Sequence, residues 1–283
     1  MILITRRNIL KGAAAACVNP MFADSESRAF QIGACDWSMG KRGDMEALSL
    51  AGQIGLDGVQ VSFGPPGEGH DLRDVDVLKK YKHLEQKHGT RIGSLAMGVL
   101  NQRPLKSDPE AVQWVSDSVD VAEAVGSRVV LLAFFGKGDL KGDAKGTANV
   151  ISKLKDVAPK AEKAGVIFGL ETWLDMHEHL HIIEAVGSPN VQVYYDTGNS
   201  LHRGYDIYRE IRQLGSEHIC ELHAKDYSGK PFGQGHVDFR EVRRAVDEIG
   251  FNGWIQIEGR TTYREVDKLK NDATYLRGVF SRQ

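Results

Sequence analysis

The stretch "ICELHAKDYSGKPFGQG", residues 219–235, decides the fold of this chain. It starts like a buried strand, yet four ionisable side chains fall within six residues before a glycine-rich loop begins. Successive side chains of a strand point to opposite sides. Glu221, His223 and Lys225 therefore share one side, and the opposite side is apolar. The alternation predicts a strand that is polar on one side, and Asp226 is expected to point outward and cap the loop.

Seven further short runs are also rich in residues that favour strands, and longer amphipathic segments separate them. Several of these segments begin with Asp and end with Gly, the usual start and stop signals of a helix. Eight strand and helix pairs over about 250 residues predict an α/β fold, a closed (β/α)8 TIM barrel. The alternative is an open doubly wound sheet, but no glycine-rich dinucleotide motif follows the first strand. The predicted strands are residues 30–35, 58–63, 91–97, 128–135, 166–171, 191–196, 218–224 and 254–259.

The N-terminal segment, residues 1–28, is predicted to lie outside the barrel, which then takes residues 29–283 as a single domain. The paired Arg6 and Arg7 precede a run of small apolar residues, and this order resembles the twin-arginine signal of bacterial export. The protein is therefore expected to be exported to the periplasm. Lipid attachment at Cys17 and a basic N-terminus on a cytosolic protein are the alternatives.

The charge of the chain makes nucleic acid an unexpected partner. The formal net charge is −2, and removal of residues 1–23, which hold three basic and no acidic residues, changes it to −5. An acidic protein is poorly suited to bind a phosphate backbone. Beyond the leader, no apolar run reaches the roughly 18 residues that span a membrane, so no membrane span is expected. Cys35 and Cys220 adjoin apolar runs and are predicted to be core residues.

The last four predicted strands each end on a side chain that can bind a metal ion. In a (β/α)8 barrel the active site lies at the carboxyl ends of the strands. Residues one or three steps before these side chains are mostly apolar and those two steps before are small or polar, so all four should point into the barrel. Three carboxylates and an imidazole would repel one another without a cation. Their oxygen and nitrogen donors favour one divalent ion, Mn²⁺, Mg²⁺, Co²⁺ or Zn²⁺, at Glu171, Asp196, His223 and Glu258.

The motifs around these residues resemble those of the sugar phosphate isomerase/epimerase family of xylose isomerase-like TIM barrels. They are "GLETW", "YYDTGN", "ELHAKDY", "GQGHVDF" and "IEG", and the resemblance runs from about residue 30 to the C-terminus. The family includes ketose 3-epimerases, hydroxypyruvate isomerases, inosose dehydratases and, more distantly, endonuclease IV. The resemblance implies that the same four residues bind the metal. It also implies that Glu171 and Glu258 are the acid/base pair on opposite sides of the substrate.

Five further residues are predicted to contact substrate. Asn199 stands where many relatives have a histidine that touches substrate or a further metal, which argues against a multinuclear site. His202 lies three residues further on and is a second candidate. Lys225 and Trp173 share the strand side of the metal ligands that precede them. Lys230 lies near the position at which ketose epimerases place a substrate-binding arginine.

Other polar residues receive structural roles. Glu221 is expected to support His223 from behind the metal site. His177, His179 and His181 alternate at a predicted helix start, and we expect a solvated helical face there rather than a second metal site.

The predicted function is a metal-dependent isomerase or epimerase of a small carbohydrate, which removes a proton next to a carbonyl through an enediolate. Loss of the next hydroxyl would make the enzyme a dehydratase or lyase instead. An endonuclease IV-like hydrolase would need more histidines than "VQVSFG", "SLAMGV" and "DTGN" supply. A non-catalytic carbohydrate-binding barrel would not need both glutamates. The sequence leaves the oligomeric state open, a homo-oligomer included.

Overall fold

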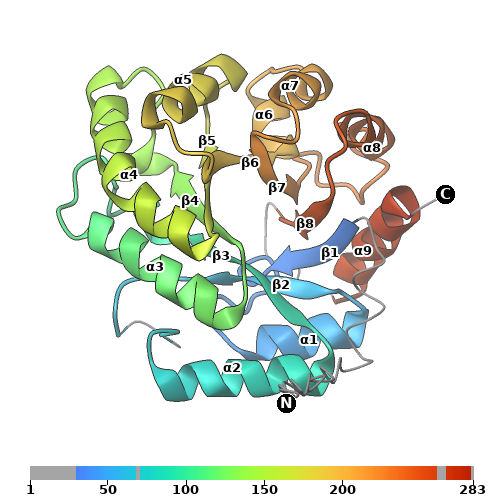
Figure 1. Cartoon of the computed structure of the whole chain (residues 1–283). Helices are drawn as coiled ribbons and strands as arrows, with labels where there is room; N and C mark the ends of the chain where they lie inside the picture. Colours follow the sequence, from blue (N-terminus) through green and yellow to red (C-terminus); the bar gives the residue numbers. More distant parts are fainter. Residues whose placement is uncertain (1–29, 68–70, 260–265, 282–283) are drawn as a thin grey trace, which may run out of the picture.

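A computed structural model describes residues 30–67, 71–259 and 266–281 of the chain. Eight parallel strands pair in sequence order, and β1 pairs with β8 to close a barrel that the helices surround (Figure 1). The predicted TIM barrel is therefore confirmed, whereas the predicted leader, residues 1–28 with Cys17, lies outside the described residues. The strands are β1 (Phe30–Cys35), β2 (Gly58–Ser62), β3 (Arg91–Met97), β4 (Val129–Phe134), β5 (Ile167–Thr172), β6 (Val191–Asp196), β7 (Ile219–Ala224) and β8 (Gly253–Ile257).

Several helices begin or end at the residues that the sequence signals indicate. Aspartate side chains accept hydrogen bonds from first-turn N–H groups of α2, α4, α5, α7 and α8, and glycines in the left-handed conformation end α1 to α5. Among the described helices, none combines the length and the apolar composition that crossing a membrane requires. The helices are α1 (Glu46–Ile54), α2 (Val75–His88), α3 (Ala111–Val125), α4 (Ala144–Ala164), α5 (Met176–Val186), α6 (Thr197–His202), α7 (Ile207–Leu214), α8 (Phe239–Glu248) and α9 (Val266–Phe280), with short 3₁₀ turns η1 (Gly98–Asn101) and η2 (Gly136–Gly138).

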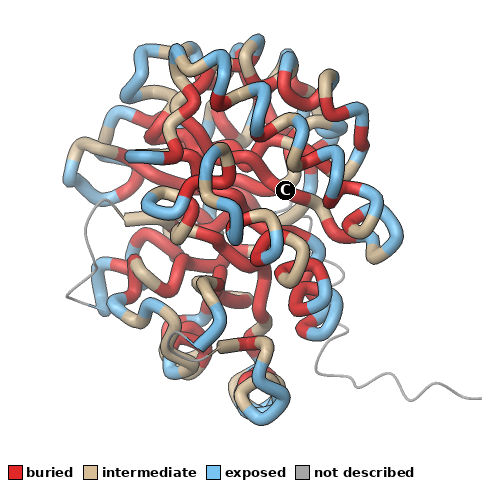
Figure 2. The backbone as a smooth tube through the Cα atoms, turned by 90° about the vertical axis from the view of Figure 1, so that its left-hand side faces the viewer, coloured by how far each residue is buried: buried red, intermediate tan, exposed pale blue. Residues whose placement is uncertain are grey.

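The apolar core lies between the strands and the surrounding helices, and buried residues fill the centre of the molecule (Figure 2). Inside the barrel the side chains are mixed, because polar Gln60, Glu221 and Gln256 are buried there beside Tyr194. Space in this layer is tight. A Cβ atom on Gly33 would lie 2.2 Å from Gln256 Oε1, so a larger residue at this position of β1 would have to displace that amide.

The histidines of α5 differ from the expectation. His177 and His181 are exposed as predicted, but His179 is buried and accepts or donates a hydrogen bond at Thr172 Oγ1, 3.0 Å from its Nε2 atom. The expected solvated face is therefore wrong for His179. Residues two positions apart on a helix point about 200° apart, so His179 faces inward when its two neighbours face solvent.

The loop after β7 is built as the opening stretch predicts. Asp226 is buried and accepts hydrogen bonds from the backbone N–H groups of Ser228, His236 and Val237, at 2.6 to 2.7 Å. One buried carboxylate thus holds both ends of the glycine-rich loop and leaves Lys225, one residue earlier, on the inner side.

Candidate metal centre and active site

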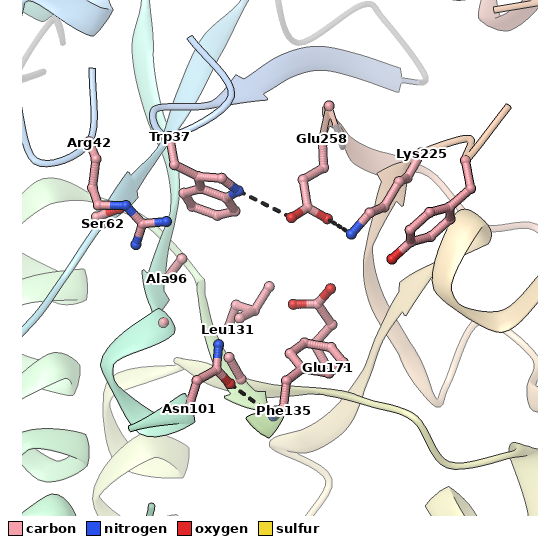
Figure 3. A pocket seen from close by; sticks show the side chains of 14 residues that line it. Trp37, Arg42, Ser62, Ala96, Asn101, Leu131, Phe135, Glu171, Lys225 and Glu258 are labelled. Atoms are coloured by element: carbon pink, nitrogen blue, oxygen red, sulfur yellow. Dashed lines mark hydrogen bonds and ion pairs between the residues drawn. The ribbon is translucent and has the colours of Figure 1, made fainter. Parts of the chain in front are cut away.

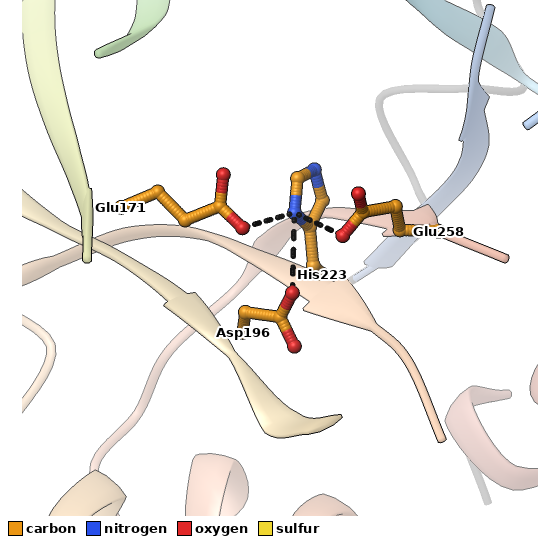
Figure 4. Close-up of side chains that lie close together, drawn as sticks. All are labelled: Glu171, Asp196, His223 and Glu258. Atoms are coloured by element: carbon orange, nitrogen blue, oxygen red, sulfur yellow. Dashed lines mark hydrogen bonds and ion pairs between the residues drawn. The ribbon is translucent and has the colours of Figure 1, made fainter. Parts of the chain in front are cut away.

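The four predicted metal ligands meet at the carboxyl end of the barrel. They come from β5, from the end of β6, from β7 and from the residue after β8, and their ligand atoms all lie within 4.8 Å of one another. His223 Nδ1 is at the centre of the group, with Glu171 and Glu258 on either side (Figure 4). Its distances are 3.2 Å to Glu171 Oε1, 3.3 Å to Glu258 Oε2 and 3.8 Å to Asp196 Oδ2.

The other ring nitrogen of His223 is held by a buried amide. Gln60 Nε2 donates to Ser94 Oγ at 3.0 Å and to Tyr194 OH at 2.9 Å, so Gln60 Oε1 must face the imidazole. His223 Nε2–H then donates to that oxygen at 2.7 Å. The Nδ1 atom faces three carboxylates, and a proton on Nδ1 or a bound metal ion makes this arrangement favourable.

The support from Glu221 is less direct than the sequence suggested. Tyr194 OH donates to Glu221 Oε2 at 3.0 Å, and the same hydroxyl accepts from Gln60. Tyr194 and Gln60 therefore connect Glu221 to His223 through hydrogen bonds. Burial raises the pKa of Glu221 to about 8.

One buried acceptor lacks a hydrogen bond where a metal ion would bind. Asp196 Oδ1 accepts from Asn199 N–H at 2.8 Å, whereas the buried Asp196 Oδ2 accepts no hydrogen bond from the part of the chain that the structure describes. It points into the ligand group, with Lys225 Nζ 3.3 Å away. Three carboxylates and one imidazole fit one divalent ion, and the donor set suits Mn²⁺, Mg²⁺, Co²⁺ or Zn²⁺.

The two glutamates differ in their electrostatic surroundings. Lys225 Nζ lies 2.8 Å from Glu258 Oε2. Burial alone would raise the pKa of Glu258, but the charges of Lys225 and His223 hold it well below its usual range. Burial raises the pKa of Glu171, to about 7, against the opposing effect of His223. The site therefore contains two carboxylates in unlike environments, a common feature of acid/base pairs.

A pocket of about 250 Å³ opens above these residues. Glu171, Glu258 and Lys225 line one side of it, and Arg42 and Asn101 line the other (Figure 3). The volume is near the low end of the roughly 300–1,000 Å³ of ligand pockets, which suits a small molecule.

Only one of the five predicted substrate contacts, Lys225, lines this pocket. Asn199 lies behind the metal ligands: its Nδ2 donates to Glu171 Oε1 at 3.1 Å, and its Oδ1 accepts from Tyr227 OH at 2.7 Å. This fixed amide orients Glu171. Lys230 is exposed on the loop after β7.

The two predicted aromatic contacts lie at the rim. Trp173 packs edge-on against Phe135, which lines the pocket, with ring centroids 4.9 Å apart. His202 is exposed and stacks on Tyr227 at 4.8 Å. Trp173 and His202 thus form an outer wall at this edge, and their contact with substrate stays a prediction.

Sequence reasoning missed Gln60 and Trp37. Gln60 could have been found, because it is the polar residue of the predicted strand 58–63 and points into the barrel. Trp37 Nε1–H donates to Glu258 Oε1 at 3.1 Å, across 221 positions of sequence. No local pattern connects two residues so far apart.

Comparison with known proteins agrees with this architecture. Residues 48–279 match the family model described as xylose isomerase-like TIM barrel. A 2-epi-5-epi-valiolone 7-phosphate 2-epimerase of Actinoplanes sp. is 27% identical over 197 residues, which are 69% of this chain and 72% of that protein. An L-ribulose-5-phosphate 3-epimerase of Salmonella paratyphi A is 27% identical over 239 residues, covering 76% of this chain and 81% of that protein.

The crystal structure of a D-allulose 3-epimerase from Methylomonas sp. has a similar fold. It superimposes with a TM-score of 0.72 over 88% of this chain and 98% of that chain, at 18% sequence identity. This likeness extends the agreement in fold to nearly the whole barrel.

Proposed function

Because this chain belongs to the xylose isomerase-like TIM barrel family, we propose that it is a metal-dependent epimerase of a small carbohydrate. The observation that carries the proposal is the convergence of four ligand atoms within 4.8 Å beside a pocket that two of the ligands, Glu171 and Glu258, also line. The curated relatives carry names of sugar or cyclitol phosphate epimerases, which favours epimerisation over dehydration.

The residues supply the parts that proton transfer next to a carbonyl requires. When bound, the divalent ion would polarise the substrate carbonyl and stabilise the charge that develops on its oxygen. Glu258 and Glu171 lie on either side of His223 Nδ1, so one carboxylate can remove a proton from one face of the carbon and the other can return it from the opposite face (Figure 4). This return inverts the stereocentre.

Neighbouring residues keep the two carboxylates in place. Trp37 fixes Glu258 through one hydrogen bond, and Asn199 fixes Glu171 through another. Lys225 also donates to the other oxygen of Glu258, Oε2, at 2.8 Å, so both carboxylates are held in fixed orientations. Such positioning is a large part of the rate acceleration in enzymes that transfer protons.

The test is solvent exchange. The protein loaded with Mn²⁺ is incubated in D₂O with D-fructose, D-allulose, L-ribulose and their terminal phosphates, and the products are followed by NMR. We expect deuterium at one carbon next to the carbonyl together with the epimer of the sugar. The matched variants Glu171→Gln and Glu258→Gln keep the shape of the side chain and should each lower the rate by at least about 100-fold. Exchange at wild-type rate in either variant would exclude its role, and a dehydrated product without an epimer would favour the lyase alternative.

A further inference from the structure

The pocket has a second charged wall that the proposed chemistry does not use. Arg42 lies in the loop between β1 and α1, and its guanidinium extends over the pocket on the side away from Lys225 (Figure 3). Its Cζ atom is 5.6 Å from the centre of the Trp37 ring. A Cβ atom on Gly98 would lie 3.5 Å from Arg42 Nη1, so the Arg42 side chain reaches the η1 turn, which also carries Asn101.

The loop that carries Arg42 is held rigidly. Asp36 is fully buried at its start, and its Oδ2 accepts from Gly43 N–H at 2.9 Å and from Ser62 N–H at 2.7 Å. Its Oδ1 accepts from the Ser62 hydroxyl at 2.7 Å. Both oxygens of Asp36 therefore accept hydrogen bonds from Gly43 or Ser62. These bonds hold the backbone next to Arg42 against β2.

Arg42 also forms no close ion pair. Among the described residues its nearest electrostatic partner is the buried Asp36, whose oxygens accept other hydrogen bonds, whereas its neighbour Lys41 forms ion pairs with Glu46 and, at 3.6 Å, with Asp44. The two adjacent basic residues of the loop thus differ. Lys41 is neutralised on the outer surface, and Arg42 presents its charge to the pocket.

A second donor lies on the same wall. Asn101 Oδ1 accepts from Phe135 N–H at 2.8 Å, which fixes the amide so that Asn101 Nδ2 turns toward the pocket (Figure 3). The wall therefore offers N–H donors from both side chains. Donors with a net positive charge bind an oxyanion better than a sugar hydroxyl.

The metal ligands do not engage Arg42. Lys225 lies between Glu258 and Asp196 on one wall of the pocket, whereas Arg42 lies on the other wall, beside Asp36. Both Asp36 oxygens accept hydrogen bonds from Gly43 and Ser62, so the N–H donors of Arg42 face the pocket.

We propose that Arg42, assisted by Asn101, recognises an anionic group of the substrate, a carboxylate or a phosphate, at the end that lies away from the metal ligands. The substrate class is then an acidic or phosphorylated sugar. This inference rests on the proposed function, because it assumes that the sugar binds with its reacting carbons at Glu171 and Glu258.

The experiment measures binding, so that it stays separate from turnover. D-fructose, D-fructose 6-phosphate and D-fructuronate are titrated by calorimetry into the Mn²⁺-loaded protein and into its Arg42→Gln and Lys41→Gln variants. Lys41→Gln removes the same charge from the neighbouring position of the loop. We expect Arg42→Gln to weaken binding of one anionic probe by about 10- to 100-fold, the range for a charge-assisted hydrogen bond, and Lys41→Gln to leave it within about 3-fold.

The two anionic probes distinguish the sources. Loss confined to D-fructose 6-phosphate assigns the wall to a phosphate, and loss confined to D-fructuronate assigns it to a carboxylate. The proposal is wrong if neither anionic probe binds more tightly than D-fructose, or if the two variants lose affinity equally. Absence of solvent exchange together with an Arg42-dependent affinity would refute the epimerase proposal and leave this one standing.

Discussion

Replacement of Lys225 by methionine removes the positive charge of the candidate metal centre and keeps most of the side-chain volume. Lys225 Nζ lies 2.8 Å from Glu258 Oε2 and 3.3 Å from Asp196 Oδ2, and all three residues are largely buried. In the metal-free protein the variant would leave two carboxylates without their nearest counter-charge.

The structure sets the size of the effect. Removal of one partner of a buried charge pair costs about 3–5 kcal/mol. Each kcal/mol lowers the melting temperature of a chain of this size by about 2–4 °C, so metal-free Lys225→Met should melt roughly 6–20 °C below the wild-type protein. The control is Lys137→Met, an exposed lysine of η2 at the same end of the barrel, which should change stability by at most about 0.5 kcal/mol.

A bound ion should reverse part of the loss. The ion supplies positive charge to the same oxygens, so Mn²⁺ should stabilise Lys225→Met more than the wild-type protein. If Mn²⁺ restores about half of the lost unfolding free energy, it stabilises Lys225→Met by about 2 kcal/mol more than the wild-type protein. This corresponds to roughly 30-fold tighter binding of Mn²⁺ by the variant. Thermal unfolding with EDTA and with graded Mn²⁺ measures both quantities. Equal or smaller stabilisation of the variant by Mn²⁺ would refute the view that Lys225 and the ion neutralise the same carboxylates.

Three further predictions follow from other contacts. Gln60→Leu removes the acceptor that fixes the His223 tautomer and should weaken Mn²⁺ binding by about 10- to 100-fold in a chelator competition assay, and unchanged affinity would contradict the role given to this amide. Burial lowers the pKa of His179 to about 4, so the unfolded chain binds a proton that the folded protein does not bind between that pH and about 6.5. The free energy of unfolding should therefore fall by about 3 kcal/mol as the pH drops through this window. Urea titrations at a series of pH values measure this change, and the unfolding free energy of His179→Gln should depend less steeply on pH than that of the wild-type protein. If the leader directs twin-arginine export, replacing Arg6 and Arg7 by lysine in the full chain should retain the protein in the cytoplasm on cell fractionation, whereas periplasmic recovery of this variant would exclude that route.

The sequence by itself determined the barrel and the direction of its polar side chains. The strands that end in candidate ligands alternate with period two, and several helices carry their own start or stop residues, so these features depend on neighbours only a few positions apart. The endings of four strands therefore indicated that Glu171, Asp196, His223 and Glu258 converge, and the structure brings them within 4.8 Å. Their role as metal ligands stays a prediction.

Only the tertiary structure decided which residues surround this group. Closure of the barrel brings β1 and β2 to the last strands, and so places Trp37 on Glu258 and Gln60 on His223. It also turned Asn199 from an expected substrate contact into the group that holds Glu171. These pairings depend on distances across the barrel between positions 28 to 221 residues apart, which local periodicity does not encode.

The wall of the pocket that carries Arg42 is a second feature that the local sequence does not determine. Arg42 and Lys41 are adjacent basic residues of one loop, and nothing in their local sequence distinguishes them. The fold places acidic partners around Lys41 and leaves Arg42 over the pocket, because loop geometry and the buried Asp36 set the direction of each side chain. The chemistry of the site could be inferred from the order of residues, but the choice of substrate depends on side chains that only the closed barrel brings together.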